Sequence, residues 1–165
     1  MTHDPTEDKL WYLNSDGTGN VYEYQNVPLA GYQWVMTRSF TVSCASSCYE
    51  LLSSPDGNEI LVSDYYGTYV YSVSDYSQGE SFSGTNPLFS FDGSTMLLLN
   101  NDYYQDNVVL ISTNGWSVES DFVAKNSGWD SITISSNDSE IFHMTKVSSN
   151  VVLLTGYMPD SDGDE

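Results

Sequence analysis

Short runs of apolar residues recur along the chain, and a polar turn separates each run from a second apolar run. The runs are too short for helices and end at turn-forming residues, so each predicts a β-strand. The pattern therefore predicts four β-hairpins. Their first strands are expected at residues 10–13, 60–62, 96–99 and 141–144, and their second strands at 21–24, 70–73, 108–111 and 151–154.

Several of these strands are apolar at consecutive positions rather than at alternate ones. This pattern is typical of a strand that is covered on both faces, as when small sheets stack against one another. A two-sheet sandwich would more often leave one face of each strand in water. Weaker strands are expected at 33–37 or 40–43, and at 49–53, 88–90, 116–123 and 132–135, whereas no helix is expected.

Similar turns precede three of the hairpins and recur with a spacing of about 40 residues, which is typical of repeat arrays and propellers. In two of them an Asp-Gly pair supplies the capped or left-handed backbone that a tight turn needs. Each repeat then holds about four strands, the size of one propeller blade. The turns are Ser54-Pro55-Asp56-Gly57, Ser90-Phe91-Asp92-Gly93 and Ser136-Asn137-Asp138-Ser139.

The segment from Ser54 to Tyr71 resembles the Ser-Pro-Asp-Gly repeats of WD40-like β-propellers, including the variety found in bacterial TolB-like proteins. Residues 9–25 resemble the second half of another such repeat. The resemblance implies an all-β fold, a partial β-propeller of about four blade units with four-stranded antiparallel blades, two of them complete. No Gly-His pair opens a blade and no Trp-Asp pair closes one, so the hydrogen-bond network of the WD40 type is not expected.

The repeats are expected to span residues 9–156, between a flexible N-terminal tail at 1–8 and an acidic C-terminal tail at 157–165. On this division the chain begins with the second strand of one blade and ends after the third strand of another, so the blades do not close a ring. Open sheet edges at both ends invite pairing with another chain, including a second copy. A fragment of a larger propeller, or a ring closed by two copies, is favoured over an open arc.

The chain has 165 residues, with 23 acidic and 4 basic side chains and a formal net charge of −19. The basic residues are scattered and form no patch that would neutralise phosphates. Neither nucleic acid nor an anionic membrane is therefore expected as a partner. A basic protein partner would be attracted, although solubility alone also explains the charge.

The N-terminus has neither the basic segment nor the apolar segment of a signal peptide, which favours the cytoplasm. The abundance of Ser, Thr, Asn and Tyr with little Lys is instead typical of exported surface proteins. The compartment is therefore left open.

Two cysteines, Cys44 and Cys48, lie four positions apart. Two thiols do not complete a zinc site alone. On one extended strand they would be about 13 Å apart, too far for a disulfide. Two free thiols are the favoured expectation. A local disulfide, which requires the segment to turn, and metal or redox chemistry are the alternatives.

Two tyrosine pairs occupy the same turn of successive hairpins. Tyrosine offers a large contact area and a hydroxyl group at low entropic cost, which suits contacts with a protein or a sugar. The alternative is a purely structural role, in which the rings shield strand ends within their own sheets. The predicted partner-binding residues are Asp64, Tyr65, Tyr66, Asp102, Tyr103 and Tyr104.

The acidic C-terminus contains Asp160, Asp162 and Asp164 at alternate positions, like the first part of a calcium-binding loop. The rest of such a loop is absent, so a solvated acidic tail is favoured over a calcium site. The histidines, His3 and His143, lie in the expected tail and in an apolar strand. Neither forms a catalytic constellation, and no cofactor is expected.

These observations predict a non-catalytic protein-interaction scaffold whose rigid blades present Tyr- and Asp-rich loops to a protein partner. The inference from fold to function is by analogy. One alternative is a secreted propeller that binds or processes glycans. Another is an architectural arc that assembles edge to edge.

Overall fold

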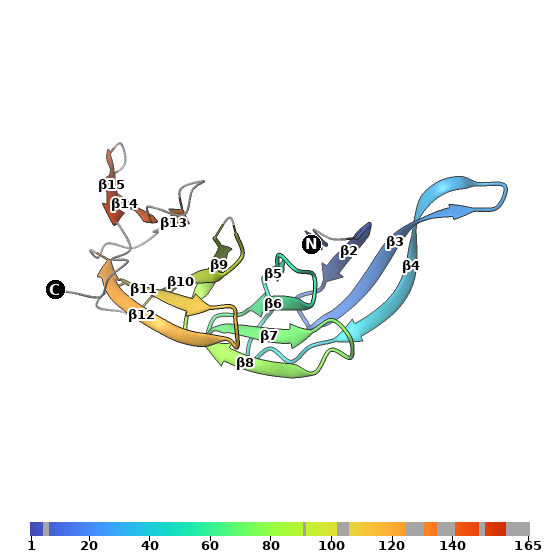
Figure 1. Ribbon diagram of the computed structural model, residues 1–165, viewed down its shortest axis with the longest axis horizontal. Coiled ribbons are helices and arrows are strands. Elements are labelled where there is room, and N and C mark those ends of the chain that lie inside the picture. The colour runs from blue at the N-terminus through green and yellow to red at the C-terminus, as the bar shows by residue number, and fades with distance from the viewer. Residues whose placement is uncertain are drawn as a thin grey trace. The chain divides into compact units, whose positions relative to one another are not determined.

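The computed structural model describes residues 1–4, 7–90, 92–101, 106–124, 131–134, 141–148 and 151–157. Within these residues the secondary structure consists of fifteen β-strands, so the protein is all-β (Figure 1). No helix in this part of the chain is long and apolar enough to span a bilayer. The chain divides into two compact units, Met1–Thr85 and Asn86–Glu165.

The first unit contains two four-stranded antiparallel sheets in which neighbouring strands are consecutive in sequence. The first sheet consists of β1 (Thr2–His3), β2 (Lys9–Leu13), β3 (Thr18–Val27) and β4 (Gly31–Thr41). The second sheet consists of β5 (Glu50–Ser53), β6 (Glu59–Ser63), β7 (Thr68–Ser72) and β8 (Gln78–Phe82).

The described residues of the second unit form a third and a fourth antiparallel sheet, with four and three strands. All four predicted hairpins are confirmed, because β2 pairs with β3, β6 with β7, β10 with β11 and β14 with β15. The third sheet consists of β9 (Thr85–Phe89), β10 (Thr95–Asn101), β11 (Asp106–Ser112) and β12 (Ser117–Ala124). The fourth consists of β13 (Ser131–Ile134), β14 (Ile141–Ser148) and β15 (Val151–Tyr157).

The N-terminal sheet has one strand more than the sequence predicts. Strand β1 pairs with β2, with Thr2 opposite Trp11, so Thr2 and His3 belong to a sheet rather than to a flexible tail. The backbone N–H of Asp4 donates to the carbonyl of Lys9 at 3.0 Å, as Ser54 donates to Glu59 at 2.9 Å. Three described sheets therefore have four strands, and the prediction of two complete four-stranded units is wrong.

The turns that precede β6 and β10 are held by an aspartate. Asp56 accepts hydrogen bonds from the hydroxyl of Ser54 at 2.7 Å and from the backbone N–H of Asn58 at 3.1 Å. Gly57 follows in the left-handed region, with φ of 74°, where other residues are strained. The same contacts are made in the second turn by Ser90, Asp92, Gly93 and Ser94.

The core of the first unit lies between its two sheets. It combines side chains of β2, β3 and β4 with side chains of β5, β6 and β7. Consecutive residues of β6 and of β10 are fully buried, as expected for strands that are covered on both faces. The principal members of the first unit's core are Trp11, Val21, Phe40, Ile60, Val62 and Tyr71.

An aromatic stack fastens the β7–β8 turn to β4. The ring of Tyr76 stacks on Phe40 with centroids 4.7 Å apart, and the guanidinium of Arg38 lies 4.6 Å above the same Tyr76 ring. Tyr76 has φ of 58°, a conformation that costs about 1–2 kcal/mol for a residue other than glycine. The stack and the cation–π contact offset that cost.

Cys44 and Cys48 form a disulfide, so the favoured expectation of two free thiols is wrong. The segment leaves β4 and turns, which brings the two Cα atoms to 5.8 Å. The turn is held at both ends by the β2–β3 connection: Val42 N donates to the carbonyl of Gly17, and Cys48 N donates to that of Ser15, both at 2.9 Å.

Removal of the disulfide by the double substitution Cys44→Ser/Cys48→Ser is expected to lower the free energy of unfolding by about 2 kcal/mol, because a loop of about five residues is no longer closed in the unfolded chain. Urea unfolding measures this loss. A reductant should destabilise the native chain by a similar amount and leave the double variant unchanged. Two thiols that titrate in the oxidised, denatured chain would contradict the assignment.

The substitution Gly17→Ala is expected to cost about 2 kcal/mol or more, for two reasons. Gly17 has φ of 86°, and a Cβ there would collide with the backbone carbonyl oxygen of Val42. Gly79→Ala is the control, because the nearest atom to a Cβ at that site is the Val70 oxygen at 3.8 Å. Urea unfolding of the two variants should separate them, and equal stabilities would contradict the role given to Gly17.

Candidate functional site

Tyr65 and Tyr66 form an exposed aromatic pair on the turn between β6 and β7. Their side chains are 81% and 65% exposed, and the two rings meet edge to face with centroids 5.5 Å apart. Two large rings that remain in water on one short turn make a contact surface without further rearrangement. The structure therefore places these two predicted residues where a partner can reach them.

Asp64 precedes the tyrosine pair, but its side chain is fully buried. Its Oδ1 accepts hydrogen bonds from the backbone N–H groups of Tyr66 at 2.7 Å and Gly67 at 3.2 Å, and its Oδ2 accepts one from Ser46 N at 3.0 Å. Asp64 therefore does not lie on the exposed surface that the sequence predicts for it. Its carboxylate instead fixes the backbone that carries the tyrosines.

The disulfide-closed segment braces the same turn from a distant part of the sequence. Besides the contact from Ser46 N to Asp64, the backbone N–H of Tyr65 donates to Ser46 Oγ at 3.1 Å. Next to the disulfide, the Tyr71 hydroxyl donates to the carbonyl of Ser43 at 2.7 Å. The tyrosine pair is thus mounted on a turn that is tied to the connection between the first and second sheets.

The electrostatics of the turn follow from these contacts. Burial in itself raises the pKa of the Asp64 carboxyl, but the backbone N–H donors, led by Ser46, outweigh burial and hold that pKa below its ordinary value of 3.8. Burial and the neighbouring Asp64 charge raise the pKa of Tyr69, whose hydroxyl lies 3.4 Å from Asp64 Oδ1. At neutral pH the turn therefore holds a charged carboxylate and a neutral phenol.

The remaining predicted site residues lie outside the described residues. They are Asp102, Tyr103 and Tyr104 of the equivalent turn and Asp160, Asp162 and Asp164 of the acidic C-terminus. Across the part of the chain that the structure describes, no three His, Cys, Asp or Glu side chains are grouped to hold a metal ion.

A second exposed aromatic cluster lies on the β3–β4 hairpin and is absent from the sequence predictions. Tyr24 stands directly opposite Trp34, with ring centroids 5.3 Å apart, and stacks on Tyr32 at 5.7 Å. Met36 lies on the same face, and we call Tyr24, Tyr32, Trp34 and Met36 the aromatic face. Their exposed fractions are 45%, 67%, 42% and 55%.

A β-bulge sets which side chains of β4 share this face. Arg38 pairs with Val21, whereas Met36 pairs with the next residue of β3, Tyr22, so Thr37 is an extra residue in β4. Arg38 contacts Tyr76 of the β7–β8 turn, on the core side of β4. The large apolar residues Tyr32, Trp34 and Met36 at alternate positions were a signal readable from the sequence. The bulge that aligns them with Tyr24 has no such local signal.

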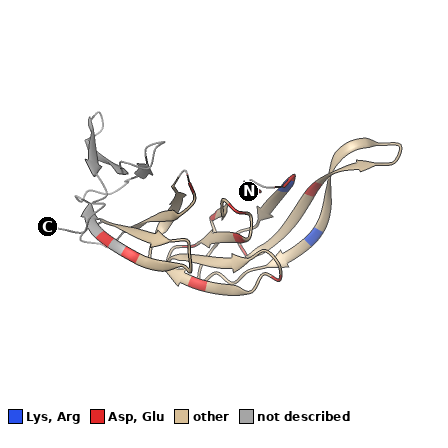
Figure 2. Cartoon of the chain, viewed as in Figure 1, with Lys and Arg blue, Asp and Glu red and all other residues tan. Residues whose placement is uncertain are grey.

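The aromatic face belongs to a segment without charged residues. Residues 24–37 contain no Asp, Glu, Lys or Arg. In Figure 2 the far end of the β3–β4 hairpin accordingly carries neither red nor blue. Charge begins at the base of the hairpin, with Glu23 and Arg38.

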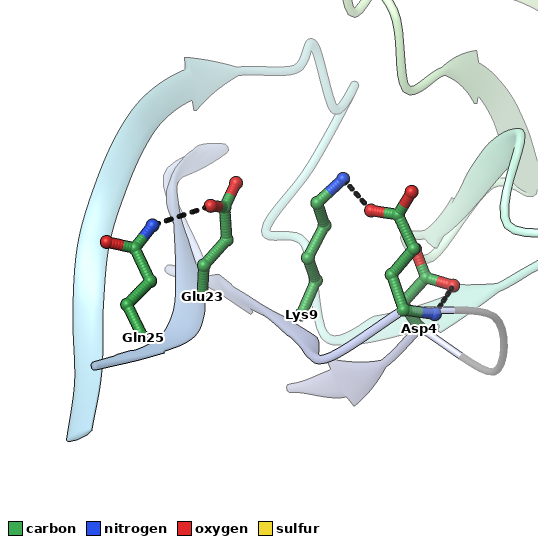
Figure 3. Close-up of polar contacts among 5 residues, drawn as sticks. Asp4, Lys9, Glu23 and Gln25 are labelled. Carbon is green, nitrogen blue, oxygen red and sulfur yellow. Dashed lines mark hydrogen bonds and ion pairs between the residues drawn. The ribbon is translucent and has the colours of Figure 1, made fainter. Parts of the chain in front are cut away.

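A polar cavity of about 460 Å³ opens where the β1–β2 connection meets the β5–β6 turn and the end of β7. Its lining includes the carboxylates of Asp4, Glu7, Asp56 and Glu59, and also Lys9. Lys9 forms an ion pair with Glu7 beside Asp4 (Figure 3). The hydrogen bond with Glu7 raises the pKa of Lys9, so the cation is held within this recess.

Neither a protein family nor a curated protein matches this sequence. Chains of solved structures do match in fold. One of them is "Kuenenia stuttgartiensis Hydrazine Synthase", which matches over 96% of this chain with a TM-score of 0.68 and 14% sequence identity. The match covers 50% of that chain, so the present chain spans about half its length. At this identity the similarity concerns the fold alone.

The substitution Asp64→Asn is expected to lower the free energy of unfolding at neutral pH by about 1–3 kcal/mol, because buried N–H groups lose a charged acceptor. The pKa of Asp64 is lowered in the folded chain, so its contribution is present above the unfolded value of 3.8 and is lost as the pH falls through the folded value. The stability difference between native and variant chains should therefore shrink in acid.

Urea unfolding over a pH series from neutral to acid measures this difference. Glu80→Gln, a substitution at an exposed position of β8, is the control and should stay close to the native chain. A native-to-variant difference that does not change with pH would contradict the role of the Asp64 charge.

Proposed function

We propose that the chain is a non-catalytic protein-interaction module made of consecutive WD40-like β-propeller blades. The repeated four-stranded antiparallel sheets and their similar Asp-Gly turns support this proposal. So does the burial of consecutive residues in β6 and β10, because blades that stack around an axis cover both faces of their inner strands.

The observation that carries the proposal is the rigid presentation of Tyr65 and Tyr66. Both rings are exposed, yet the backbone beneath them is fixed by the buried carboxylate of Asp64 and by Ser46. A backbone that is held in place before binding loses little entropy when a partner arrives. Tyrosine is also among the residues that most often dominate binding energy at protein interfaces.

The partner that we propose is a protein with a basic surface. The chain carries a formal charge of −19, so its field attracts cationic proteins and speeds their encounter. Its four basic residues offer no phosphate-binding patch, and nucleic acid and membrane surfaces are therefore not part of the proposal.

The Cys44–Cys48 disulfide favours an oxidising compartment, because disulfides persist in exported proteins and are rare in the cytosol. This observation supports a second candidate, a secreted propeller that binds glycans. Exposed aromatic rings such as those of Tyr65 and Tyr66 suit stacking on sugars as well as on proteins.

Capture from an extract of the source organism tests the first candidate. The immobilised native chain is compared with the double substitution Tyr65→Ser/Tyr66→Ser, and captured proteins are quantified by mass spectrometry. Loss of two exposed rings at the centre of an interface should reduce capture of specific partners at least about tenfold. The captured partners should be basic and should be released by salt.

Tyr32→Ser/Trp34→Ser is the matched control, because it removes the same number of exposed rings from another surface of the same unit. This control should capture the basic partners as the native chain does. Equal capture by the Tyr65→Ser/Tyr66→Ser variant would contradict the proposal. Binding of that turn to a glycan array instead would replace it with the second candidate.

A further inference from the structure

The β3–β4 hairpin continues beyond the strand that flanks it. Strand β2 pairs with β3 only as far as Lys9 opposite Glu23, and Tyr24 N then donates to the carbonyl of Asp8 at 3.0 Å. Beyond this point β3 and β4 pair only with each other, up to Val27 opposite Gly31 (Figure 1). A two-stranded ribbon is at best marginally stable in water unless one of its faces is covered.

The aromatic face of this ribbon has the size of an interface core. A covered ring removes about 150–250 Å² from water, so four large side chains that are each about half exposed offer roughly 400 Å². Protein interfaces are only about 56–58% apolar, so this apolar area corresponds to about 700 Å² of polar and apolar surface together on one copy. A standard interface buries about 800 Å² on each partner.

The absence of charge on the aromatic face favours a second copy of this chain over a basic protein as the partner. Residues 24–37 carry no charge although the whole chain carries −19, so a basic protein would find no carboxylate to pair with on this surface. An uncharged face does, however, allow two identical copies to meet without opposing like charges, as a two-fold interface requires. The remaining acidic side chains lie outside the contact, where salt screens them.

We propose that two copies of this chain associate through their β3–β4 hairpins, with the aromatic face of one copy packed against the aromatic face of the other. The contact surface is separate from the Tyr65–Tyr66 turn and does not depend on the function proposed for that turn. Burial of Trp34 and Tyr24 at its centre supplies most of the binding energy, and the charge of the two chains opposes it.

Salt dependence follows from this balance. Two chains of charge −19 repel each other, and the Debye length shortens from about 10 Å at about 0.1 M salt to about 3 Å at about 1 M. Association through an uncharged aromatic face should therefore strengthen as sodium chloride is added. Association through ion pairs would weaken instead.

Analytical ultracentrifugation of the full native chain over a concentration series, at about 0.1 M and about 1 M sodium chloride, provides the test. The expected result is a monomer–dimer equilibrium whose dissociation constant falls with salt. Tyr32→Ser/Trp34→Ser should raise that constant at least about tenfold. The matched control is Gln25→Ser/Gln33→Ser, since these two residues pair directly across the same strands on the opposite face; it should dimerise like the native chain.

Tyr32→Lys is a second variant. The Tyr32 side chain is 67% exposed, so the substitution removes little buried area, and circular dichroism checks that the variant folds. It should also prevent the dimer. A chain that stays monomeric at both salt concentrations would overturn the proposal, as would a dimer that Tyr32→Lys leaves intact or that salt dissociates. Tyr65→Ser/Tyr66→Ser should leave the dimer unchanged, so failure here and failure of the proposed function are told apart.

Discussion

Coverage of both faces of the inner strands is the constraint on which the rest of this structure depends. Ile60, Leu61 and Val62 are consecutive and fully buried, although successive side chains of a strand point to opposite faces. Exposure of one such side chain would forfeit about 1.5–3 kcal/mol, so each of these strands needs a layer on either side. In β2, by contrast, Trp11 is buried and Tyr12 is exposed.

Aspartate performs two different tasks in the turns of the second sheet. Asp56 is bonded within its own turn, to residues two positions away on either side. Asp64 also accepts a hydrogen bond from Ser46, eighteen positions away, and so joins two segments that are remote in sequence. The first contact makes a hairpin, whereas the second makes the exposed tyrosine turn rigid.

The sequence predicts the hairpins because their signals, apolar runs and Asp-Gly turns, are local. Strand β1 is missed because Asp4 stands where the other turns have Ser54 or Ser90, and only the position of the following Pro5 matches the Ser54-Pro55 turn. Strand β8 is also missed, because its residues show no apolar pattern. The burial of Asp64 and the disulfide both depend on how the segment after β4 turns, which no short window of sequence reveals.

The unpaired Thr37 in β4 decides which side chains share a face in the distal part of the β3–β4 hairpin. Because Thr37 is left unpaired, Trp34 faces the same way as Tyr24. In an uninterrupted strand Trp34 would instead stand opposite Gln25, and its indole would share a side with Glu23. Pairing of Thr37 within the ladder would therefore move the side chains of residues 31–36 to the other face and separate them from Tyr24, so the aromatic face depends on the bulge as much as on its aromatic residues.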